Sequence, residues 1–335
     1  MKFLRIAAIA ALVLVTLMLF AGCTQPTTNQ QTSTTTIKEL KIGYQPSTHQ
    51  MAHAVAMDKG WWQQDLAPYG VVNVTDYVFP TGAPEMQAML AGELDVAYVG
   101  AAPFLTALST GLDGKIIAAV NTQGSDLVLR TGLNYTGPQS LKGLKIATFQ
   151  AGTIQDTILR NWLKNNNIDP DKDLEIVGMG PGDAVTAITA GKVDAVFLPH
   201  PSPAVIEAQG AGKSVVRSGE MYPNHPCCVL VVSGKLIREH PEIVEQILRT
   251  NIRAADYITK NPDDAAAIYA AKTNTKLADV KASLNEWDGS FNADPNLIVN
   301  GVMDYAKIQY DLGYIKKPLT QDEVFDLTFY KKVTT

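Results

Sequence analysis

The stretch Ala-Gly-Glu-Leu-Asp-Val-Ala-Tyr-Val at residues 91–99 returns as Ala-Gly-Lys-Val-Asp-Ala-Val-Phe-Leu at residues 190–198, 99 positions later. A shorter pair precedes these copies, with Lys-Ile-Gly-Tyr-Gln at 41–45 and Lys-Ile-Ala-Thr-Phe-Gln at 145–150. Each copy is an apolar run followed by a polar turn and a segment with helical spacing. A period of about 100 residues is too long for a solenoid and close to the size of one domain. The repeat therefore predicts two similar α/β lobes with a ligand site between them.

Strand-like and helix-like segments alternate through both copies. Strands are predicted at 40–44, 72–79, 96–99, 116–119, 126–130, 145–148, 174–177, 194–197, 214–216 and 228–232. Helices are predicted between them at 50–66, 85–91, 103–109, 154–165, 184–190 and 203–209. This alternation predicts right-handed βαβ units and mostly parallel, doubly wound sheets. From residue 235 onward only helical spacing is found, at 241–260, 264–271 and 277–287, and we expect this tail to pack on the first lobe.

The segments divide the chain into parts with different roles. Residues 38–130 and 234–335 are predicted to form lobe 1, and residues 131–233 to form lobe 2. A chain that crosses between lobes more than once makes a hinge of a few residues. Residues 24–37 are rich in threonine and glutamine and too polar to seed a core, so they are predicted to be a flexible tether.

Residues 1–23 have the features of a lipoprotein signal peptide. Lys2 and Arg5 precede an apolar run at 7–21, which is shorter than the roughly 20 residues of a membrane span but suits a signal-peptide core. The run ends in Ala21-Gly22-Cys23, which resembles a lipobox and predicts lipidation of Cys23. An uncleaved N-terminal anchor is the alternative. Both predict an exported, extracytoplasmic protein tethered to the membrane.

Charge and cysteine content exclude some partners and cofactors. The formal net charge is −5, which argues against nucleic acid, because phosphate backbones require basic patches. Cys227 and Cys228 are adjacent, and strand geometry predicts two buried thiols that point to opposite faces. Neither cysteine belongs to a CxxC or HxxxH spacing, so the sequence predicts no metal site and no cofactor.

Candidate ligand-binding residues lie where predicted strands end and helices begin. Ligands of doubly wound sheets bind at this edge, and helix N-termini there suit an oxyanion. The candidates are Ser47, Thr48, His49, Gly100, Ala101, Ala102, Gly152, Thr153, Asp183 and His200. Ser47 has capping-box spacing to Gln50, while Thr153 and Asp183 are predicted helix caps.

Simpler interpretations of several of these residues stay open. The caps would form with or without a ligand, and the glycines could serve tight turns alone. Asp95 and Asp194 of the repeat are interpreted as structural turn residues. No lysine or arginine occupies the predicted loops, so three options remain: binding by amides and hydroxyls, a charge supplied by Arg130, or a ligand that is not a simple anion.

Together these motifs resemble a known family. The Ala-Gly-x-x-Asp turns, Gly100-Ala101-Ala102-Pro103, His200-Pro201-Ser202-Pro203, the lipobox and the tether resemble ABC-transporter solute-binding proteins of the nitrate/sulfonate/taurine family. The resemblance covers about residues 40–306. It implies a two-lobed fold of periplasmic-binding-protein type 2 that closes on nitrate, an aliphatic sulfonate or taurine. The expected partners are an ABC permease and its ATPase, and we expect a monomer.

Proteins that resemble this fold also have functions other than the transport of oxyanions. Related proteins bind thiamine precursors, riboflavin or aromatic acids. The pyrimidine synthases of thiamine biosynthesis also resemble this fold, but they carry a cysteine-rich motif and a lysine that holds pyridoxal. The predicted folded part of this chain has only the Cys227-Cys228 pair, and the sequence has no GxSxG, P-loop or GxGxxG motif, so an enzyme is not expected. A surface sensor is the third class, and a neighbouring permease gene would favour transport over it.

Overall fold

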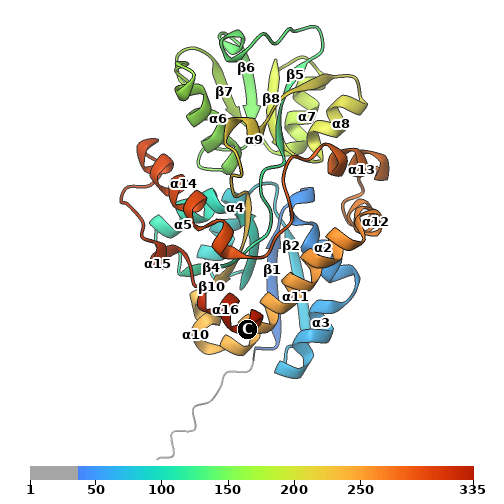
Figure 1. Cartoon of the computed structure of the whole chain (residues 1–335), viewed down its shortest axis with the longest axis vertical. Coiled ribbons are helices and arrows are strands. Elements are labelled where there is room, and N and C mark those ends of the chain that lie inside the picture. The colour runs from blue at the N-terminus through green and yellow to red at the C-terminus, as the bar shows by residue number, and fades with distance from the viewer. Residues whose placement is uncertain (1–36) are drawn as a thin grey trace, which may run out of the picture. The chain divides into compact units, whose positions relative to one another are not determined.

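The computed structural model describes residues 37–335, which lie in one compact unit. The predicted signal peptide, the lipidation site Cys23 and nearly all of the predicted tether lie outside the described residues. The described residues form two five-stranded sheets with helices packed on them, which can be followed by their labels in Figure 1. The predicted α/β class with two similar lobes is therefore confirmed.

Both sheets have the same internal order. The first runs β2-β1-β3-β10-β4, from β1 (Glu39–Tyr44), β2 (Asn73–Val78), β3 (Val96–Gly100), β4 (Gly114–Ala119) and β10 (Cys228–Ser233). The second runs β7-β6-β8-β5-β9, from β5 (Ser125–Arg130), β6 (Lys145–Thr148), β7 (Glu175–Gly178), β8 (Ala195–Pro199) and β9 (Gly212–Arg217). The strands that contain the repeated sequence, β3 and β8, are buried along their whole length, as expected for central strands.

Two strands cross between the sheets and correct the predicted lobe boundaries. β5 follows β4 in the chain but pairs antiparallel with β8 and β9, and β10 returns to pair antiparallel with β3 and β4. The predicted boundaries after residues 130 and 233 assign β5 to lobe 1 and β10 to lobe 2, so both assignments are wrong. Each crossing strand supplies backbone partners for a neighbouring lobe's central strand, and an apolar run alone does not reveal which strand it will pair with.

The repeated aspartates have the same structural role in both lobes. The Asp95 carboxylate accepts a hydrogen bond from the Lys41 backbone N–H at 2.9 Å, and Asp194 accepts one from Lys145 at 3.0 Å. Each aspartate thereby ties the turn before the central strand to the start of the neighbouring strand. The glycine three residues earlier has a positive φ in both copies, 77° at Gly92 and 66° at Gly191. The repeat thus specifies a turn, in agreement with the structural interpretation of these aspartates.

The helices of the two lobes follow the predicted pattern with two departures: one predicted helix is interrupted, and the short helix at Ser218–Met221 was not predicted. They are α2 (Met51–Asp58), α3 (Trp61–Leu66), α4 (Gly82–Leu90), α5 (Ala101–Ser109), α6 (Ile154–Asn165), α7 (Pro181–Thr189), α8 (Ser202–Ala208) and α9 (Ser218–Met221). The single helix predicted at 50–66 is wrong. Its chain breaks between α2 and α3 at Gly60, whose φ of 67° lies outside the helical region.

The C-terminal tail is helical and covers the first sheet. It consists of α10 (Gly234–Glu239), α11 (Pro241–Lys260), α12 (Pro262–Thr273), α13 (Leu277–Glu286), α14 (Val299–Asp311), α15 (Gln321–Val324) and α16 (Thr328–Thr334). α11 packs on α2 and α3, α12 on α2, and α14 on α5, as expected for a tail on lobe 1. The tail also reaches the second lobe, because α13 packs on α8 and α14 on α6. No helix among residues 37–335 has the length and apolar character of a membrane span.

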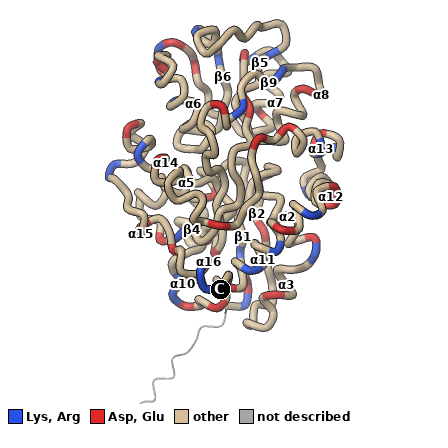
Figure 2. Tube along the Cα trace, in the orientation of Figure 1, with Lys and Arg blue, Asp and Glu red and all other residues tan. Residues whose placement is uncertain are grey.

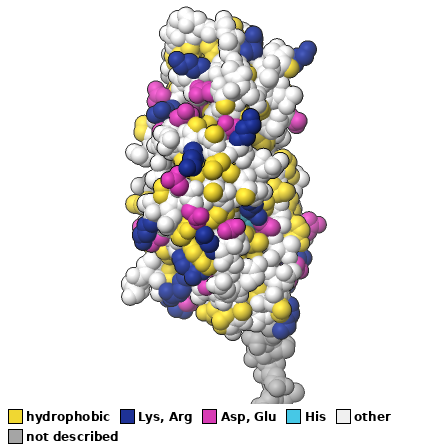
Figure 3. Space-filling model, turned by 90° about the vertical axis from the view of Figure 1, so that its right-hand side faces the viewer, with side chains coloured by type: hydrophobic (Ala, Val, Ile, Leu, Met, Phe, Trp, Pro, Cys, Tyr) yellow, Lys and Arg dark blue, Asp and Glu magenta, His cyan; other side chains and the backbone are white. Residues whose placement is uncertain are grey.

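The surface is charged without a large block of one sign on the face shown. Figure 3 views the side of the molecule turned by 90° from Figure 1, and lysine, arginine and acidic side chains are interspersed there. In Figure 2, basic and acidic positions are both spread over the helices and loops, including those of the tail. Charges of both signs are therefore mixed on the face shown.

Candidate functional site

A small cavity lies where the strand ends of the two sheets face each other. Its volume is about 20 Å³, which is room for roughly one water molecule. The residues that line it lie at or after the ends of β1, β2, β3, β6 and β8 or at the start of β10, so both lobes contribute to it. They are Gln45, Ser47, His49, Gly82, Gly100, Pro103, Phe149, Thr153, Ile154, Gln155, Pro199, Cys227 and Cys228.

Hydrogen bonds and close packing hold the lobes together around this cavity. The Ser47 hydroxyl and the Thr48 backbone N–H both donate to the carbonyl oxygen of His200, at 3.0 and 3.1 Å. A β-carbon added to Gly100 would lie 3.0 Å from the side chain of Ile154 in the opposite lobe. The cleft is therefore closed, and a ligand larger than a water molecule requires the lobes to separate.

Four of the predicted ligand-binding residues line the cavity: Ser47, His49, Gly100 and Thr153. Three more, Thr48, Ala101 and Ala102, are buried beside it without lining it. Ser47 caps the short helix that follows it by accepting from the His49 N–H, as predicted, but Gln50 bonds the N–H of Gln45 instead of that of Ser47. Thr153 is the N-cap residue of α6, yet its hydroxyl donates to the Gln150 carbonyl.

The other three predicted residues lie elsewhere. Asp183 is exposed in the first turn of α7, whose N-cap is Gly180, so the predicted cap is wrong. Gly152 faces a neighbouring apolar groove of about 260 Å³, and its N–H donates to Asp156 at 3.1 Å. The imidazole of His200 is buried with its Nε2 atom 3.6 Å from the Asp126 carboxylate. Only the backbone oxygen of His200 is turned to the other lobe.

No fixed positive charge reaches the cavity among the described residues that line it. Arg130 does not supply one, because its guanidinium bonds Asp194 at 3.0 Å. The available donors are amide and backbone N–H groups, including the N–H groups of Ile154 and Gln155 at the start of α6, which have no partner within the helix. The hydroxyls of Ser47 and Thr153 already donate to backbone carbonyls. Burial raises the pKa of Glu85 well above its usual value, and this carboxyl accepts from the Gln45 amide at 2.6 Å. The carboxyl group next to the cavity is thus held toward its neutral form.

Several lining residues were missed by the sequence analysis. Gln45 and Phe149 directly follow predicted strands, so the strand-end rule could have identified them. Gln155 lies at the second position of α6, and its amide donates to Ser125 at 3.0 Å. The two cysteines were interpreted only as buried thiols. Their place at the cavity depends on β10 returning to the first sheet, which no local pattern indicates.

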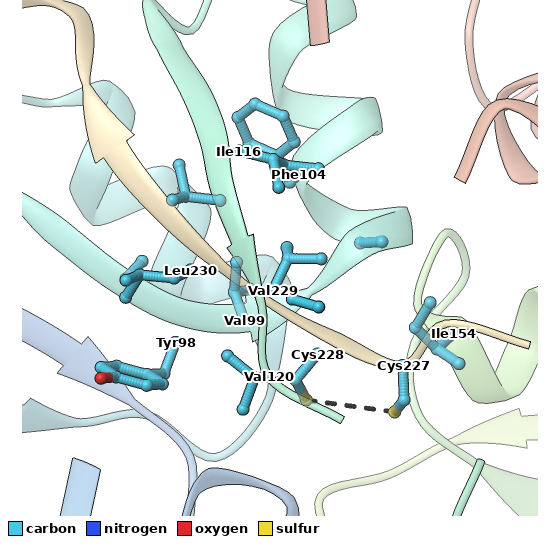
Figure 4. Packing of buried hydrophobic residues seen from close by; sticks show 14 of the residues in the cluster. Tyr98, Val99, Phe104, Ile116, Val120, Ile154, Cys227, Cys228, Val229 and Leu230 are labelled. Carbon is cyan, nitrogen blue, oxygen red and sulfur yellow. Dashed lines mark hydrogen bonds between the residues drawn. The ribbon is translucent and has the colours of Figure 1, made fainter. Parts of the chain in front are cut away.

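The adjacent cysteines form a cluster with His49. β10 begins at Cys228, so Cys227 precedes the strand, and the two sulfur atoms lie 4.0 Å apart instead of on opposite faces as predicted (Figure 4). The Sγ atom of Cys227 lies 3.2 Å from the His49 Nδ1 atom. The hydrogen bond from the Cys227 thiol lowers the pKa of Cys228, with further lowering by His49 and Gln50, while burial opposes it. The same contact raises the pKa of Cys227, as does burial.

The fold and the cleft define a class of protein, and comparisons with known proteins agree with it. The alkanesulfonate-binding protein SsuA from Xanthomonas axonopodis pv. citri, solved with MOPS, is similar with a TM-score of 0.76 at 19% identity, covering 86% of this chain and 98% of that one. The periplasmic nitrate-binding protein NrtA from Synechocystis PCC 6803 has a TM-score of 0.76 at 16% identity, covering 89% and 88%. The fold is that of periplasmic binding proteins, as predicted.

The sequence comparisons then identify the family. The chain matches the NMT1-like family over residues 33–273 and belongs to it. A protein of Bacillus subtilis (strain 168) named as an aliphatic sulfonates-binding protein is 24% identical over 300 residues, which is 88% of each chain. The predicted resemblance to ABC solute-binding proteins of the nitrate and sulfonate type is therefore confirmed.

Proposed function

We propose that this protein is the solute-binding component of an ABC importer and clamps a small ligand between its two lobes. The observation that carries the proposal is the cavity itself, since equivalent strand ends of both repeats line it and inter-lobe hydrogen bonds close it. Two segments cross between the sheets, next to β5 and β10, and provide the hinge on which the lobes separate. The ligand is then delivered to a permease and its ATPase.

The ligand class we propose is a small oxyanion of the nitrate, aliphatic sulfonate or taurine type. The relatives named above support this class. The site would bind it without a fixed cation, through the second N–H of the Gln155 amide and the backbone N–H groups at the start of α6. The Ser47 hydroxyl becomes a donor when the lobes separate, because it bonds the His200 carbonyl oxygen in the closed form. A vitamin precursor or another small organic ligand on the same fold is the alternative. No lysine lines the described cavity to hold pyridoxal, which supports binding over catalysis.

We further propose an extracytoplasmic location with a lipid at Cys23, and a monomeric state. The charged start, the short apolar run and Ala21-Gly22-Cys23 support the anchor. The anchor would keep the protein at the membrane that holds its permease.

Binding and closure can be tested together. Purified protein is screened by thermal unfolding and calorimetry against nitrate, an alkanesulfonate, taurine and a thiamine-type pyrimidine. A cognate ligand at 100 times its Kd stabilises the fold by about 2.7 kcal/mol, and X-ray scattering should show a smaller radius of gyration. Tight binding without compaction would contradict the clamp, and binding of the pyrimidine alone would contradict the oxyanion class.

A matched pair of variants locates the binding site. Gln155→Ala removes a buried amide at the cavity and should weaken binding at least about tenfold, or 1.4 kcal/mol. Asp183→Ala removes an exposed side chain on α7 that does not line the cavity and should leave affinity unchanged. Equal losses in both variants would place the ligand elsewhere.

A further inference from the structure

Three potential metal ligands meet at the cavity wall. His49 belongs to the short helix after β1, Cys227 precedes β10 and Cys228 begins it. One donor atom from each residue lies within 4.8 Å of the other two, and all three side chains are buried. The two sulfur atoms face each other in Figure 4. Since the same three residues line the cavity, the cluster is bordered by open space.

The surrounding groups orient the cluster toward that space. The His49 Nε2 atom lies 2.6 Å from the Gly124 carbonyl oxygen, which can only accept, so Nε2 donates and Nδ1 faces the sulfur of Cys227. Metal-binding histidines characteristically donate their second nitrogen to a carbonyl in this way. Trp287 stacks on the imidazole with a centroid distance of 5.3 Å, and the Gln50 amide points to the Cys228 sulfur at 3.8 Å.

We propose that His49, Cys227 and Cys228 form a binding site for a thiophilic d¹⁰ cation, Zn²⁺ or Cu⁺. One imidazole and two thiolates are the ligands these ions prefer. Usual bond lengths and tetrahedral angles around Zn²⁺ require sulfur atoms roughly 3.8 Å apart and sulfur–nitrogen distances of roughly 3.6 Å. The sulfur atoms lie 4.0 Å apart, and the Cys227 sulfur lies 3.2 Å from the His49 Nδ1 atom. The Cys228 sulfur lies within 4.8 Å of the histidine donor atom, so a side-chain rotation that closes this third distance would complete the geometry.

The charge balance favours a cation at this place. Binding of the ion releases one proton from each of the two thiols, and Zn²⁺ with two thiolates carries no net charge. No lysine or arginine lines this described cavity, so the ion itself balances the two thiolates that its binding creates. The cavity of about 20 Å³ leaves a fourth coordination position for one water molecule or another oxygen ligand. The site goes beyond the proposed transport of an oxyanion and does not depend on it.

The test uses the full chain with Cys23→Ser, which removes the only other cysteine. The protein is reduced, stripped with a chelator, and titrated with Co²⁺ and then Zn²⁺. We expect one equivalent of Co²⁺ to produce thiolate-to-cobalt absorption and one equivalent of Zn²⁺ to abolish it. Cys227→Ser, Cys228→Ser and His49→Gln should each weaken Zn²⁺ binding at least about 100-fold. His240→Gln, at the junction of α10 and α11, is the matched control and should bind as the parent does.

Each outcome decides for or against the site. The proposal would be overturned if the parent showed no cobalt absorption. It would also be overturned if the Zn²⁺ affinity of the parent persisted in both cysteine variants. The first of these measurements does not depend on the folding of any variant. A disulfide between the two cysteines that persists under reducing conditions would also overturn it. Displacement of Zn²⁺ by Cu⁺ through the same three residues would support the site with Cu⁺ as its occupant. Oxyanion binding and compaction are measured separately on metal-free protein. Failure of the proposed transport function can therefore be distinguished from failure of the metal site.

Discussion

Replacing Gly100 with valine tests whether the two lobes close directly on each other. Gly100 ends β3 with a φ of −60°, which any residue can adopt, so the substitution adds bulk without backbone strain. Its β-carbon would lie 3.0 Å from Ile154 Cγ1 and 3.3 Å from Pro103 Cδ. The two methyl groups of valine extend further. Overpacking of this kind costs about 1–3 kcal/mol.

Because Ile154 belongs to the opposite lobe, opening the cleft relieves the closer of the two contacts, whereas the contact with Pro103 lies within the first lobe and remains. A cost of about 1–3 kcal/mol shifts the ratio of open to closed molecules by roughly 5- to 150-fold. X-ray scattering of the ligand-free protein should therefore give a larger radius of gyration for Gly100→Val than for the parent. The thermal unfolding midpoint should fall only modestly, because the contact that remains within the first lobe, with Pro103 at 3.3 Å, is the looser of the two.

Gly43→Val is the matched control for a clash within one lobe. A β-carbon at Gly43 would lie 2.7 Å from Leu94 Cδ1 and 2.9 Å from Glu85 Oε1, and both neighbours belong to the first lobe. No hinge motion relieves this contact, so Gly43→Val should lower the unfolding midpoint and leave the radius of gyration unchanged. If Gly100→Val behaved like Gly43→Val in both measurements, the idea that a hinge motion relieves the contact between Gly100 and Ile154 would be refuted.

Three further predictions follow from other parts of the chain. Asp194→Asn weakens the bonds to Lys145 and Arg130 and should lower the urea unfolding free energy by roughly 1–3 kcal/mol while sparing ligand affinity. The Lys145 N–H, together with Arg130, holds the pKa of Asp194 below its usual value. The stabilisation by the Asp194 carboxylate is therefore present above about pH 4 and disappears as the pH falls through the lowered pKa. A difference in unfolding free energy between variant and parent that persisted in strong acid would refute this. Burial lowers the pKa of His53, so the unfolded chain takes up a proton near pH 6.5 that the folded one does not. Stability should thus fall as the pH drops below about 6.5, and His53→Asn should reduce this slope in urea titrations at a series of pH values; equal slopes would contradict the assignment. Cys23→Ala should release the protein from membranes or leave its precursor unprocessed, and an unchanged mature mass with unchanged membrane association would argue against lipidation.

Much of the architecture is readable from the sequence because it depends on local and repeated patterns. The copies at 91–99 and 190–198 predict two similar lobes, and the structure places both on central buried strands. Apolar runs in the sequence identify the strands within a few residues, because burial and side-chain alternation determine which residue types occur in a short segment. The aspartates at 95 and 194 were recognised as turn residues for the same reason. The strand-end rule also located Ser47, His49, Gly100 and Thr153 near the cavity.

What only the tertiary structure decided depends on contacts between distant segments. The partners of β5 and β10 are set by which strands present free backbone groups, and a one-dimensional pattern does not contain this information. The sequence features of the cavity residues are shared by Gly152, Asp183 and His200. In the folded structure, however, none of these three residues lines the cavity. His49 and Cys227 are 178 positions apart, so their sulfur–nitrogen contact at 3.2 Å exists only because β10 returns beside β3. Local spacing excluded a metal motif, whereas the folded chain assembles its donor atoms from two separate strand ends.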